Sequence, residues 1–320
     1  MGINYSIIIP HKNTPRLLQR CLDSIPRRDD IQIIVVDDNS DPGKVDFSNF
    51  PGEGSPNVEV YFPKEGRGAG YARNLGLTKS VGRWTLFADA DDFYNPCLLD
   101  SIDKYEKSDF DIVYFCTNAL DSDTLMPSRE SEAKNALNQV SRMVHDALQT
   151  DDYEELRYKN YTSWAKLISS DLIRRHQLRF DETKANNDVM FNVQAAHFAG
   201  KVVADTSVIY CVTYHGESLI MNFSEEACKA RLYVNQRCNE FLQRVGKTQY
   251  RTNLFPFIIS RDGFTLGGFG RRLSILHASY VFRWLLIDMF IHVGLLVKIF
   301  INPSQRKLWQ NRRKMIESSK

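Results

Sequence analysis

The sequence lacks the cysteine spacing of a disulfide framework or of a zinc site. Its six cysteines are scattered, and no Cys-x-x-Cys pair occurs among them. Closely spaced cysteine pairs are the usual signature of zinc ligands, and regular spacing is typical of small disulfide-bonded domains. We therefore expect free thiols that lie mostly in the core: Cys21, Cys97, Cys116, Cys211, Cys228 and Cys238.

The first residues lack the features of a signal peptide. The segment MGINYSIIIPHKN has no basic region followed by a long apolar run and a small-residue cleavage site. Those three features together direct a chain to secretion. We therefore expect the protein to stay in the cytosol.

The whole chain has little net charge, +2 at pH 7, but the charge is unevenly spread. With 43% hydrophobic and 25% charged residues, the 320-residue chain is typical of a globular protein with a sizeable core. Residues 271–320 hold ten Lys and Arg against Asp288 and Glu317, so this segment is +8 and the other 270 residues are −6 by difference. The basic C-terminal segment is therefore electrostatically distinct from the rest.

Short apolar runs alternate with helix-like segments in the first third of the chain. They predict strands at 5–10, 31–38, 58–63 and 83–92, and helices at 16–25, 68–81 and 97–106. Strands that alternate with helices form a mainly parallel sheet covered by helices. The predicted fold class is therefore α/β, in which ligands bind beyond the carboxyl ends of the strands.

Three of the predicted strands end in conspicuous polar groups. These are Pro10–Asn13, Asp37–Ser40 and Asp89–Asp92. Parallel strands bring their carboxyl ends to one edge of the sheet, so we expect the two groups of aspartates to lie close together. Clustered carboxylates repel and raise one another's pKa unless a cation or hydrogen-bond donors offset their charge. An ordinary acidic turn is the alternative for any one group alone.

A divalent cation with oxygen ligands fits such a cluster best. Mg²⁺ and Mn²⁺ prefer carboxylates and usually share their coordination shell with substrate phosphates. A phosphate needs basic partners in turn, and the glycine-rich segment KEGRGAGYARNLG offers Lys64, Arg67 and Arg73. A solvated loop position is the alternative for Arg67, whereas Arg73 lies inside the predicted helix.

The order of these motifs resembles family 2 of the inverting GT-A glycosyltransferases, of the bacterial cell-surface polysaccharide type. SIIIPHKN, LLQRCLDSI, IIVVDDNSD, GAGYARNLGL and GRWTLFADADDFYNP carry the resemblance, which covers residues 4–100 closely. It continues more loosely through SWAKLISSDLIRRHQLRFDE, NNDVMFNVQAAHFAG and VTYHGESL. The resemblance implies a GT-A nucleotide-sugar-binding fold with a central, mostly parallel sheet, and a nucleotide-sugar donor, with a UDP-sugar expected.

The resemblance also implies roles for individual residues of the donor site. Asp37 and Asp38 match the pair that contacts uracil and ribose, and Arg73 matches the arginine that faces the diphosphate. Asp89 and Asp91 match the Asp-x-Asp pair, with Asp91 as the direct metal ligand and Asp89 nearer the ribose. The matching positions also include Pro10 and Asn13 in the nucleotide pocket and Asp92 toward the sugar, while Lys12 departs from the aromatic residue that the family often has there.

The general base is expected in the second half of the chain. In the family it is usually the Asp of a Glu-Asp pair that opens a helix, and Asn187-Asp188 stands at that position. Asn187 departs from the pattern, and a simple helix cap is the alternative for Asp188. His215 falls where related enzymes place a histidine or basic residue over the diphosphate, with a surface-loop histidine as the alternative. Trp164 matches a recurrent Trp near the acceptor, with a buried aromatic anchor as the alternative.

The basic C-terminal segment contains a long but interrupted apolar stretch. In ILHASYVFRWLLIDMFIHVGLLVKIFI, charged or titratable residues recur at Arg283, Asp288, His292 and Lys298. Charges near the middle of a membrane-spanning helix are costly, so we expect an amphipathic helix that lies on an anionic membrane surface. Packing on the catalytic domain or formation of a homodimer is the alternative. No nucleic-acid-binding fold accompanies the basic residues, so no nucleic acid partner is expected.

These expectations divide the chain into two regions. Residues 1–220 form the GT-A domain, with a nucleotide-binding half at 1–118 and an acceptor half at 119–220, and residues 221–320 form a helical C-terminal region. The expected activity is an inverting sugar transfer with Mn²⁺ or Mg²⁺ to a lipid-linked or surface-polysaccharide acceptor, at the inner face of the cell membrane. The alternatives are a haloacid-type phosphohydrolase, which also has Asp-x-Asp after a strand, and a noncatalytic nucleotide-binding relative that acts in an assembly.

Overall fold

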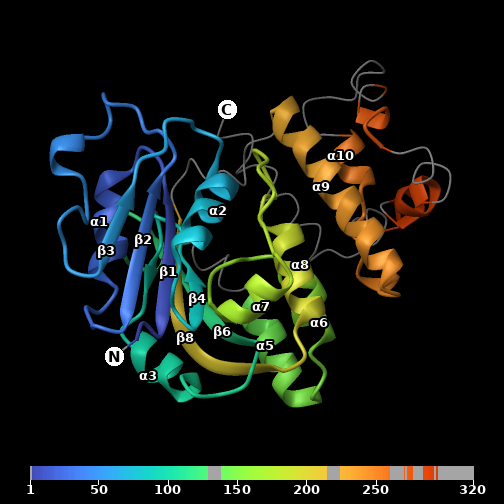
Figure 1. Cartoon of the computed structure of the whole chain (residues 1–320). Coiled ribbons are helices and arrows are strands. Elements are labelled where there is room, and N and C mark those ends of the chain that lie inside the picture. Colours follow the sequence, from blue (N-terminus) through green and yellow to red (C-terminus); the bar gives the residue numbers. More distant parts are fainter. Residues whose placement is uncertain are drawn as a thin grey trace. The chain divides into compact units, whose positions relative to one another are not determined.

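The chain forms two compact units, Met1–His215 and Gly216–Lys320 (Figure 1). The structure is a computed structural model, and it describes residues 2–128, 138–214, 224–259, 270, 272–276, 284–291 and 293–294. All six cysteines are free, and only Cys97 is not fully buried. The expectation of free thiols that lie mostly in the core is therefore confirmed.

An eight-stranded sheet forms the centre of the first unit, in the order β3-β2-β1-β4-β7-β6-β8-β5. The strands are β1 (Tyr5–His11), β2 (Ile31–Asp37), β3 (Val58–Tyr61), β4 (Trp84–Phe87), β5 (Phe93–Tyr94), β6 (Ile112–Asp121), β7 (Lys166–Ser169) and β8 (Val202–Tyr214). Parallel pairing joins β3, β2, β1 and β4, and also β6 and β8. β7 is antiparallel to both of its neighbours, and β5 to β8. The expected α/β fold with a mostly parallel sheet is confirmed.

Helices follow most strands of the first unit, and the second unit contains further helices. Those of the first unit are α1 (Pro15–Asp23), α2 (Ala69–Lys79), α3 (Leu98–Ile102), α5 (Gln139–Thr150), α6 (Glu154–Lys159), α7 (Ser170–Arg175) and α8 (Val189–Phe198). The second unit contains α9 (Glu225–Arg244), α10 (Phe255–Ile259) and a helical segment at 284–291. Short 3-10 turns lie at Phe47–Asn49, Asp103–Tyr105 and Thr248–Tyr250. The helical C-terminal region is therefore present, as expected.

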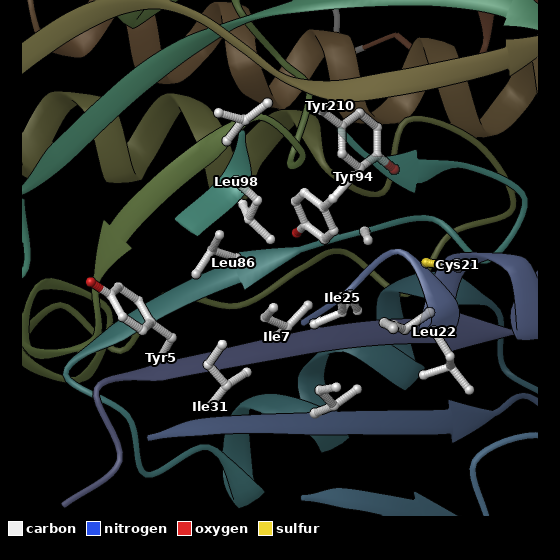
Figure 2. Close-up of a cluster of buried hydrophobic side chains, with 14 of the residues drawn as sticks. Tyr5, Ile7, Cys21, Leu22, Ile25, Ile31, Leu86, Tyr94, Leu98 and Tyr210 are labelled. Atoms are coloured by element: carbon white, nitrogen blue, oxygen red, sulfur yellow. The ribbon is translucent and has the colours of Figure 1, made fainter. Parts of the chain in front are cut away.

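β1 and β2 are buried along their whole length because helices cover both faces of the sheet. Successive side chains of a strand point to opposite faces. Ile7 packs with Leu22 of α1 on one face, as Figure 2 shows, whereas Ile8 packs on the other face in the cluster that contains Ala72 of α2. The unbroken apolar run that predicted β1 is typical of a strand covered on both sides.

Two glycines let helix α2 approach its neighbours closely. A Cβ added to Gly76 would lie 2.5 Å from Cγ2 of Ile8 on β1, and one added to Gly70 would lie 2.0 Å from the carbonyl oxygen of Asp181. Real side chains do not tolerate such separations, so the helix would have to move. Because α2 carries Arg73, its close packing fixes where that arginine stands.

We expect Gly76→Ala to destabilise the first unit. Alanine favours a helix over glycine by about 1 kcal/mol, but overpacking against Ile8 costs about 1–3 kcal/mol, so the free energy of unfolding should fall. Denaturant titration of Gly76→Ala, Ile8→Ala and the double variant measures the coupling, and the double variant should lose less than the two single losses combined. Thr78→Ala, at an exposed position of the same helix, is the control. A stabilising Gly76→Ala would contradict the packing described here.

Candidate functional site

Asp37 ends β2 and is anchored by protein groups on both of its oxygens. His11 at the end of β1 approaches it at 2.7 Å through Nδ1, and Ser40 donates its backbone N–H at 2.8 Å and its hydroxyl at 2.6 Å. The N–H of Thr14 donates to His11 Nε2, so Nδ1 carries the ring proton and donates it to Asp37. Burial raises the pKa of Asp37, but the hydrogen bonds from His11 and Ser40 outweigh it, and the pKa lies below its usual range.

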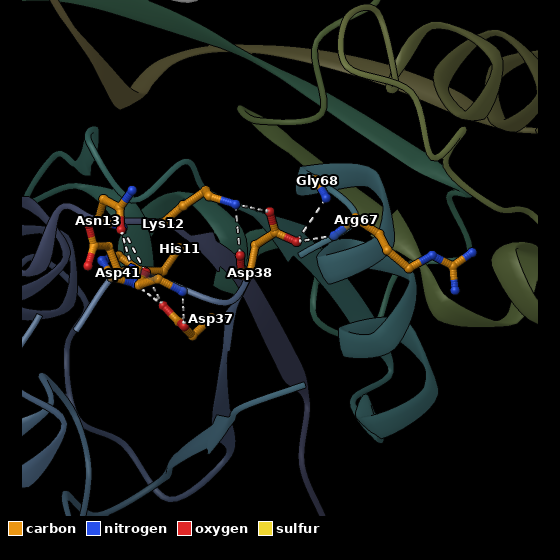
Figure 3. A network of polar contacts seen from close by, with 9 residues as sticks. His11, Lys12, Asn13, Asp37, Asp38, Asp41, Arg67 and Gly68 are labelled. Atoms are coloured by element: carbon orange, nitrogen blue, oxygen red, sulfur yellow. Dashed lines mark hydrogen bonds and ion pairs between the residues drawn. The ribbon is translucent and has the colours of Figure 1, made fainter. Parts of the chain in front are cut away.

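Asp38 connects the end of β2 to the glycine-rich segment that precedes α2. Its Oδ1 accepts the backbone N–H groups of Arg67 and Gly68, both at 2.8 Å, as Figure 3 shows. Lys12 donates to its Oδ2 and to its backbone oxygen, both at 3.0 Å. The Asp38 side chain is 5% exposed. Lys12, which replaces the aromatic ring of the family pattern, is therefore an ionic partner of Asp38.

The other residues expected in the nucleotide pocket differ in their surroundings. Pro10 is buried in β1 opposite Val36. Asn13 has a positive φ of 60°, and its side-chain oxygen accepts the N–H of Asp41 at 2.8 Å. Lys64 is exposed in the glycine-rich segment. His215 lies outside the described residues, so its expected place over the diphosphate stays a prediction, as do the expected nucleotide contacts of the other residues.

The Asp-x-Asp turn follows β4 and is held from β8. Tyr210 accepts the backbone N–H of Asp89 at 2.9 Å and donates its hydroxyl to Asp92 at 3.0 Å. The N–H of Thr213 donates to the second oxygen of Asp92 at 2.7 Å. Asp92 is buried, and both of its carboxylate oxygens accept hydrogen bonds from β8. Asp89 and Asp91 are half-buried. The contact of Asp92 with the sugar was expected from the resemblance and stays a prediction.

Arg20 of α1 supports the same turn together with Thr213 of β8, to whose hydroxyl it donates at 3.1 Å. Its guanidinium donates to the backbone oxygen of Asp91 at 2.5 Å and to that of Ser122 at 2.6 Å. Thr213 donates its hydroxyl to the same oxygen of Asp91 at 2.5 Å. The backbone of the turn is therefore fixed.

The carboxylates of this turn have an unfavourable electrostatic environment. Burial and the charge of Asp91 raise the pKa of Asp89, although Arg73 lowers it. Burial, and then the charges of Asp91 and Asp89, raise the pKa of Asp92 well above its usual range. Among the described residues, no three His, Cys, Asp or Glu side chains are grouped as a metal site. Asp89 and Asp91 nevertheless suit a hard divalent cation, because the neighbouring positive charge does not fully offset theirs. Such a cation would complete its coordination shell with phosphate oxygens.

Arg73 joins the Asp-x-Asp turn to the segment that opens α8. It donates to Asp89 Oδ1 at 2.5 Å and to Asn187 Oδ1 at 2.8 Å, and its side chain is 7% exposed. The guanidinium carbon lies 5.4 Å from the centre of the Phe180 ring. The structure therefore brings together two motifs that are about 100 residues apart in the sequence.

Asp188 stands at the N-cap position of α8, but its carboxylate makes no capping hydrogen bond. The helix-cap alternative therefore does not describe its side chain. Burial raises the pKa of Asp188, while the positive charges of Arg73 and Lys166 lower it. A half-buried carboxylate with a raised pKa beside a cationic group suits the role of a general base.

Further residues support the Asp-x-Asp turn, and of these the sequence singled out Trp164. Trp164 stacks on Tyr210, with ring centroids 5.4 Å apart and planes 7° apart, so it supports the tyrosine that holds the Asp-x-Asp turn. Tyr210 and Thr213 lie more than 115 residues after that turn, in β8, and of the two only Thr213 falls in a segment of the resemblance, VTYHGESL. Arg20 and His11 lie inside two of the motifs, but neither of them stands out from the sequence without the fold.

Comparison with known proteins finds relatives of this chain among glycosyltransferases. The family model described as "Glycosyl transferase family 2" matches residues 6–164. EpsH of Bacillus subtilis, which has the name of a glycosyltransferase, is 25% identical over 261 residues, or 79% of this chain and 74% of EpsH. EpsJ of the same organism, also named a glycosyltransferase, is 28% identical over 203 residues, and the match spans 57% of EpsJ.

Solved structures share the fold. TarS of S. aureus, in a crystal structure with UDP-GlcNAc, aligns with a TM-score of 0.63 and 18% identity over 86% of this chain and 80% of that one. The mannosyltransferase PcManGT of Pyrobaculum calidifontis, in complex with GDP-Man and Mn²⁺, aligns with a TM-score of 0.56 and 14% identity over all of this chain and 86% of the other. Identities this low show a common fold only.

Proposed function

We propose that this chain, which belongs to glycosyl transferase family 2, moves a sugar from a nucleotide-sugar to an acceptor hydroxyl with inversion. One observation carries the proposal. Arg73 contacts both Asp89 of the Asp-x-Asp turn and Asn187, the neighbour of Asp188. A donor diphosphate at the turn would therefore lie beside the half-buried carboxylate of Asp188, which can accept a proton. The family assignment argues against the haloacid-type phosphohydrolase.

In this mechanism Asp188 accepts the proton of the acceptor hydroxyl while that oxygen attacks the anomeric carbon in line with the departing nucleoside diphosphate. Arg73 faces the leaving group and stabilises its developing negative charge. Asp89 and Asp91 would hold a Mn²⁺ or Mg²⁺ ion, which supplies further positive charge to the diphosphate oxygens. A UDP-sugar is the proposed donor, because Asp37 and Asp38 match the family's uracil and ribose contacts.

We expect Asp188→Asn to reduce transfer by about 10²-fold or more, because the amide cannot accept the proton. Donor binding should change little, since Asp188 has no proposed contact with the nucleotide. The measurement is release of nucleoside diphosphate from a panel of UDP- and GDP-sugars in the presence of a bacterial lipid extract. Asp171→Asn, at an exposed aspartate, is the matched control. Unchanged turnover in Asp188→Asn would remove the base assignment, whereas a wild type that is itself inactive across the panel would favour the noncatalytic alternative.

Removal of divalent metal should abolish turnover, and Mn²⁺ or Mg²⁺ should restore it. We also expect Asp91→Asn to weaken binding of Mn²⁺ in the presence of UDP, as measured by calorimetry, by at least about tenfold on loss of one charged ligand. Asp100→Asn, an exposed aspartate further along the chain, is the control for nonspecific charge effects. Full activity in excess chelator would show that the carboxylates hold no essential metal.

The second unit supports the proposed association with a membrane surface. Asp288, which interrupts the apolar stretch, is 1% exposed and pairs with Arg251 at 3.2 Å, and the Arg251 guanidinium lies 3.7 Å from the centre of the Trp284 ring. Among the residues of the same segment that the structure describes, the exposed side chains are apolar: Leu286, Ile287, Phe290, Ile291 and Val293. The charge is therefore turned inward and the apolar side chains outward, as on a helix that lies in a membrane interface. Among the described helices, none has both the length and the apolar composition needed to cross a bilayer.

A peripheral position on the inner face of the cell membrane would bring the enzyme to a lipid-linked acceptor. We expect the wild type to sediment with vesicles that contain anionic lipid, and Phe290→Glu to reduce the bound fraction because it places a charge on the apolar surface. Tyr233→Glu, at a half-exposed aromatic residue on α9, is the control. High salt should release part of the bound protein, since the basic residues of 271–320 contribute. Equal sedimentation of all three proteins would contradict a membrane role for this segment and favour a homodimer contact.

A further inference from the structure

Lys166 is a buried lysine that has no carboxylate partner within the described part of the chain. It is the first residue of β7 and is 3% exposed. Its Nζ donates to the backbone oxygen of Asn160 at 3.0 Å and to Oδ1 of Asn192 at 2.9 Å. Lysine is almost never buried without an ionic partner, because an ammonium group loses its hydration there. Such a residue needs an explanation other than packing.

The two hydrogen bonds suit both protonation states of the amine. A neutral amine has two protons, and each finds one of the two acceptors. The third proton of the ammonium form has the face of Tyr114 nearby, with Nζ 5.4 Å from the ring centroid. Burial lowers the pKa of Lys166 to about 7, although the charge of Asp188 raises it. Lys166 can therefore be cationic at and below neutral pH without losing its partners.

Asn192 links Lys166 to Asp188. Asn192 lies one turn after Asp188 on α8, and its Nδ2 donates to the backbone oxygen of Asp188 at 2.9 Å and to that of Tyr161 at 2.9 Å. The backbone N–H of Asn192 donates to the same oxygen of Asp188 at 3.0 Å. The first turn of α8 is thus tied through one amide to β7.

We propose that Lys166 is a positioning residue for Asp188: through Asn192 it fixes the first turn of α8, and its positive charge keeps the Asp188 carboxylate ionised. This inference rests on the proposed role of Asp188 as the base. No residue of this chain of contacts is a proposed metal ligand. Lys166 itself does not touch the substrate in this account.

The charges around both groups give the direction of the effect. Asp188 is affected by Arg73 and Lys166, which favour its ionised form, and by Asp89, which disfavours it. Lys166 is near Asp188 and Tyr114, and Arg157 and Tyr158 act on Tyr114 from α6. Removing the positive charge of Lys166 therefore makes the Asp188 carboxylate harder to ionise. The acid limb of the rate profile should then move to higher pH.

The test is the pH dependence of kcat for Lys166→Met, Lys166→Gln and Lys166→Arg. In the two neutral variants we expect the acid limb to move upward by about one pH unit, so that kcat at a pH on that limb falls by up to about tenfold, while KM for the donor stays within about twofold. Lys166→Arg keeps the charge and should keep the acid limb of the wild type. Lys107→Met, at an exposed lysine, is the control.

Lys166→Gln still offers an amide N–H to Asn192. It therefore keeps the test valid if Lys166→Met fails to fold. If the acid limb stays in place in Lys166→Gln, or moves equally in Lys166→Arg, the lysine is merely structural and the inference is wrong. Asp188→Asn separates this failure from that of the proposed function. An inactive Asp188→Asn with an unmoved limb in Lys166→Gln overturns the inference alone, whereas a fully active Asp188→Asn removes the base on which it rests.

Discussion

The pairing of Arg73 with Asp89 and Asn187 is the interaction on which the site depends. A buried guanidinium is costly unless its donors are satisfied and its charge is offset. Here Asp89 and Asn187 accept hydrogen bonds from the two terminal nitrogens, and Asp89 offsets the charge through an ion pair. A carboxylate at position 187 would offset more of the positive charge of Arg73. Asn187 therefore leaves Arg73 with more positive potential to offer to a diphosphate.

The rest of the fold serves to put these groups within reach of one another. Gly70 and Gly76 let α2 lie tightly against its neighbours. This close packing fixes the position of Arg73, which α2 carries. Tyr210 of β8 and Arg20 of α1 hold the Asp-x-Asp turn through hydrogen bonds to its backbone. The aspartates of that turn are thus placed by groups that leave the Asp89 and Asp91 side chains half-buried at the rim.

The alternating pattern of strands and helices was sufficient to predict β1, β2, β3 and α2, whereas the strand predicted at 83–92 ends at Phe87, so that Asp89–Asp92 form a turn. Parallel pairing of β2 and β4 with β1 puts the carboxyl ends of these strands at one edge of the sheet. The alternating pattern could not predict the contribution of β8, because strand pairing between distant segments leaves no local pattern. Lys166 lies in the segment SWAKLISSDLIRRHQLRFDE, for which no strand or helix was predicted, and only the fold shows that it is buried. Asp288 likewise looked like an interruption of an apolar face, whereas its pairing with Arg251 turns it inward.

The central claim is that the Asp-x-Asp turn and Asp188 belong to one site around a metal-bound diphosphate. Mn²⁺ is paramagnetic and broadens the NMR signals of nearby amides, so a titration of the ¹⁵N-labelled protein with Mn²⁺ in the presence of UDP tests the claim directly. We predict that the amide signals of Asp89, Arg73 and Asp188 broaden together at stoichiometric metal, while that of Tyr5 at the opposite end of β1 stays sharp. Broadening at Asp89 with a sharp Asp188 signal would contradict a single site, and no broadening at stoichiometric Mn²⁺ would contradict the metal site itself.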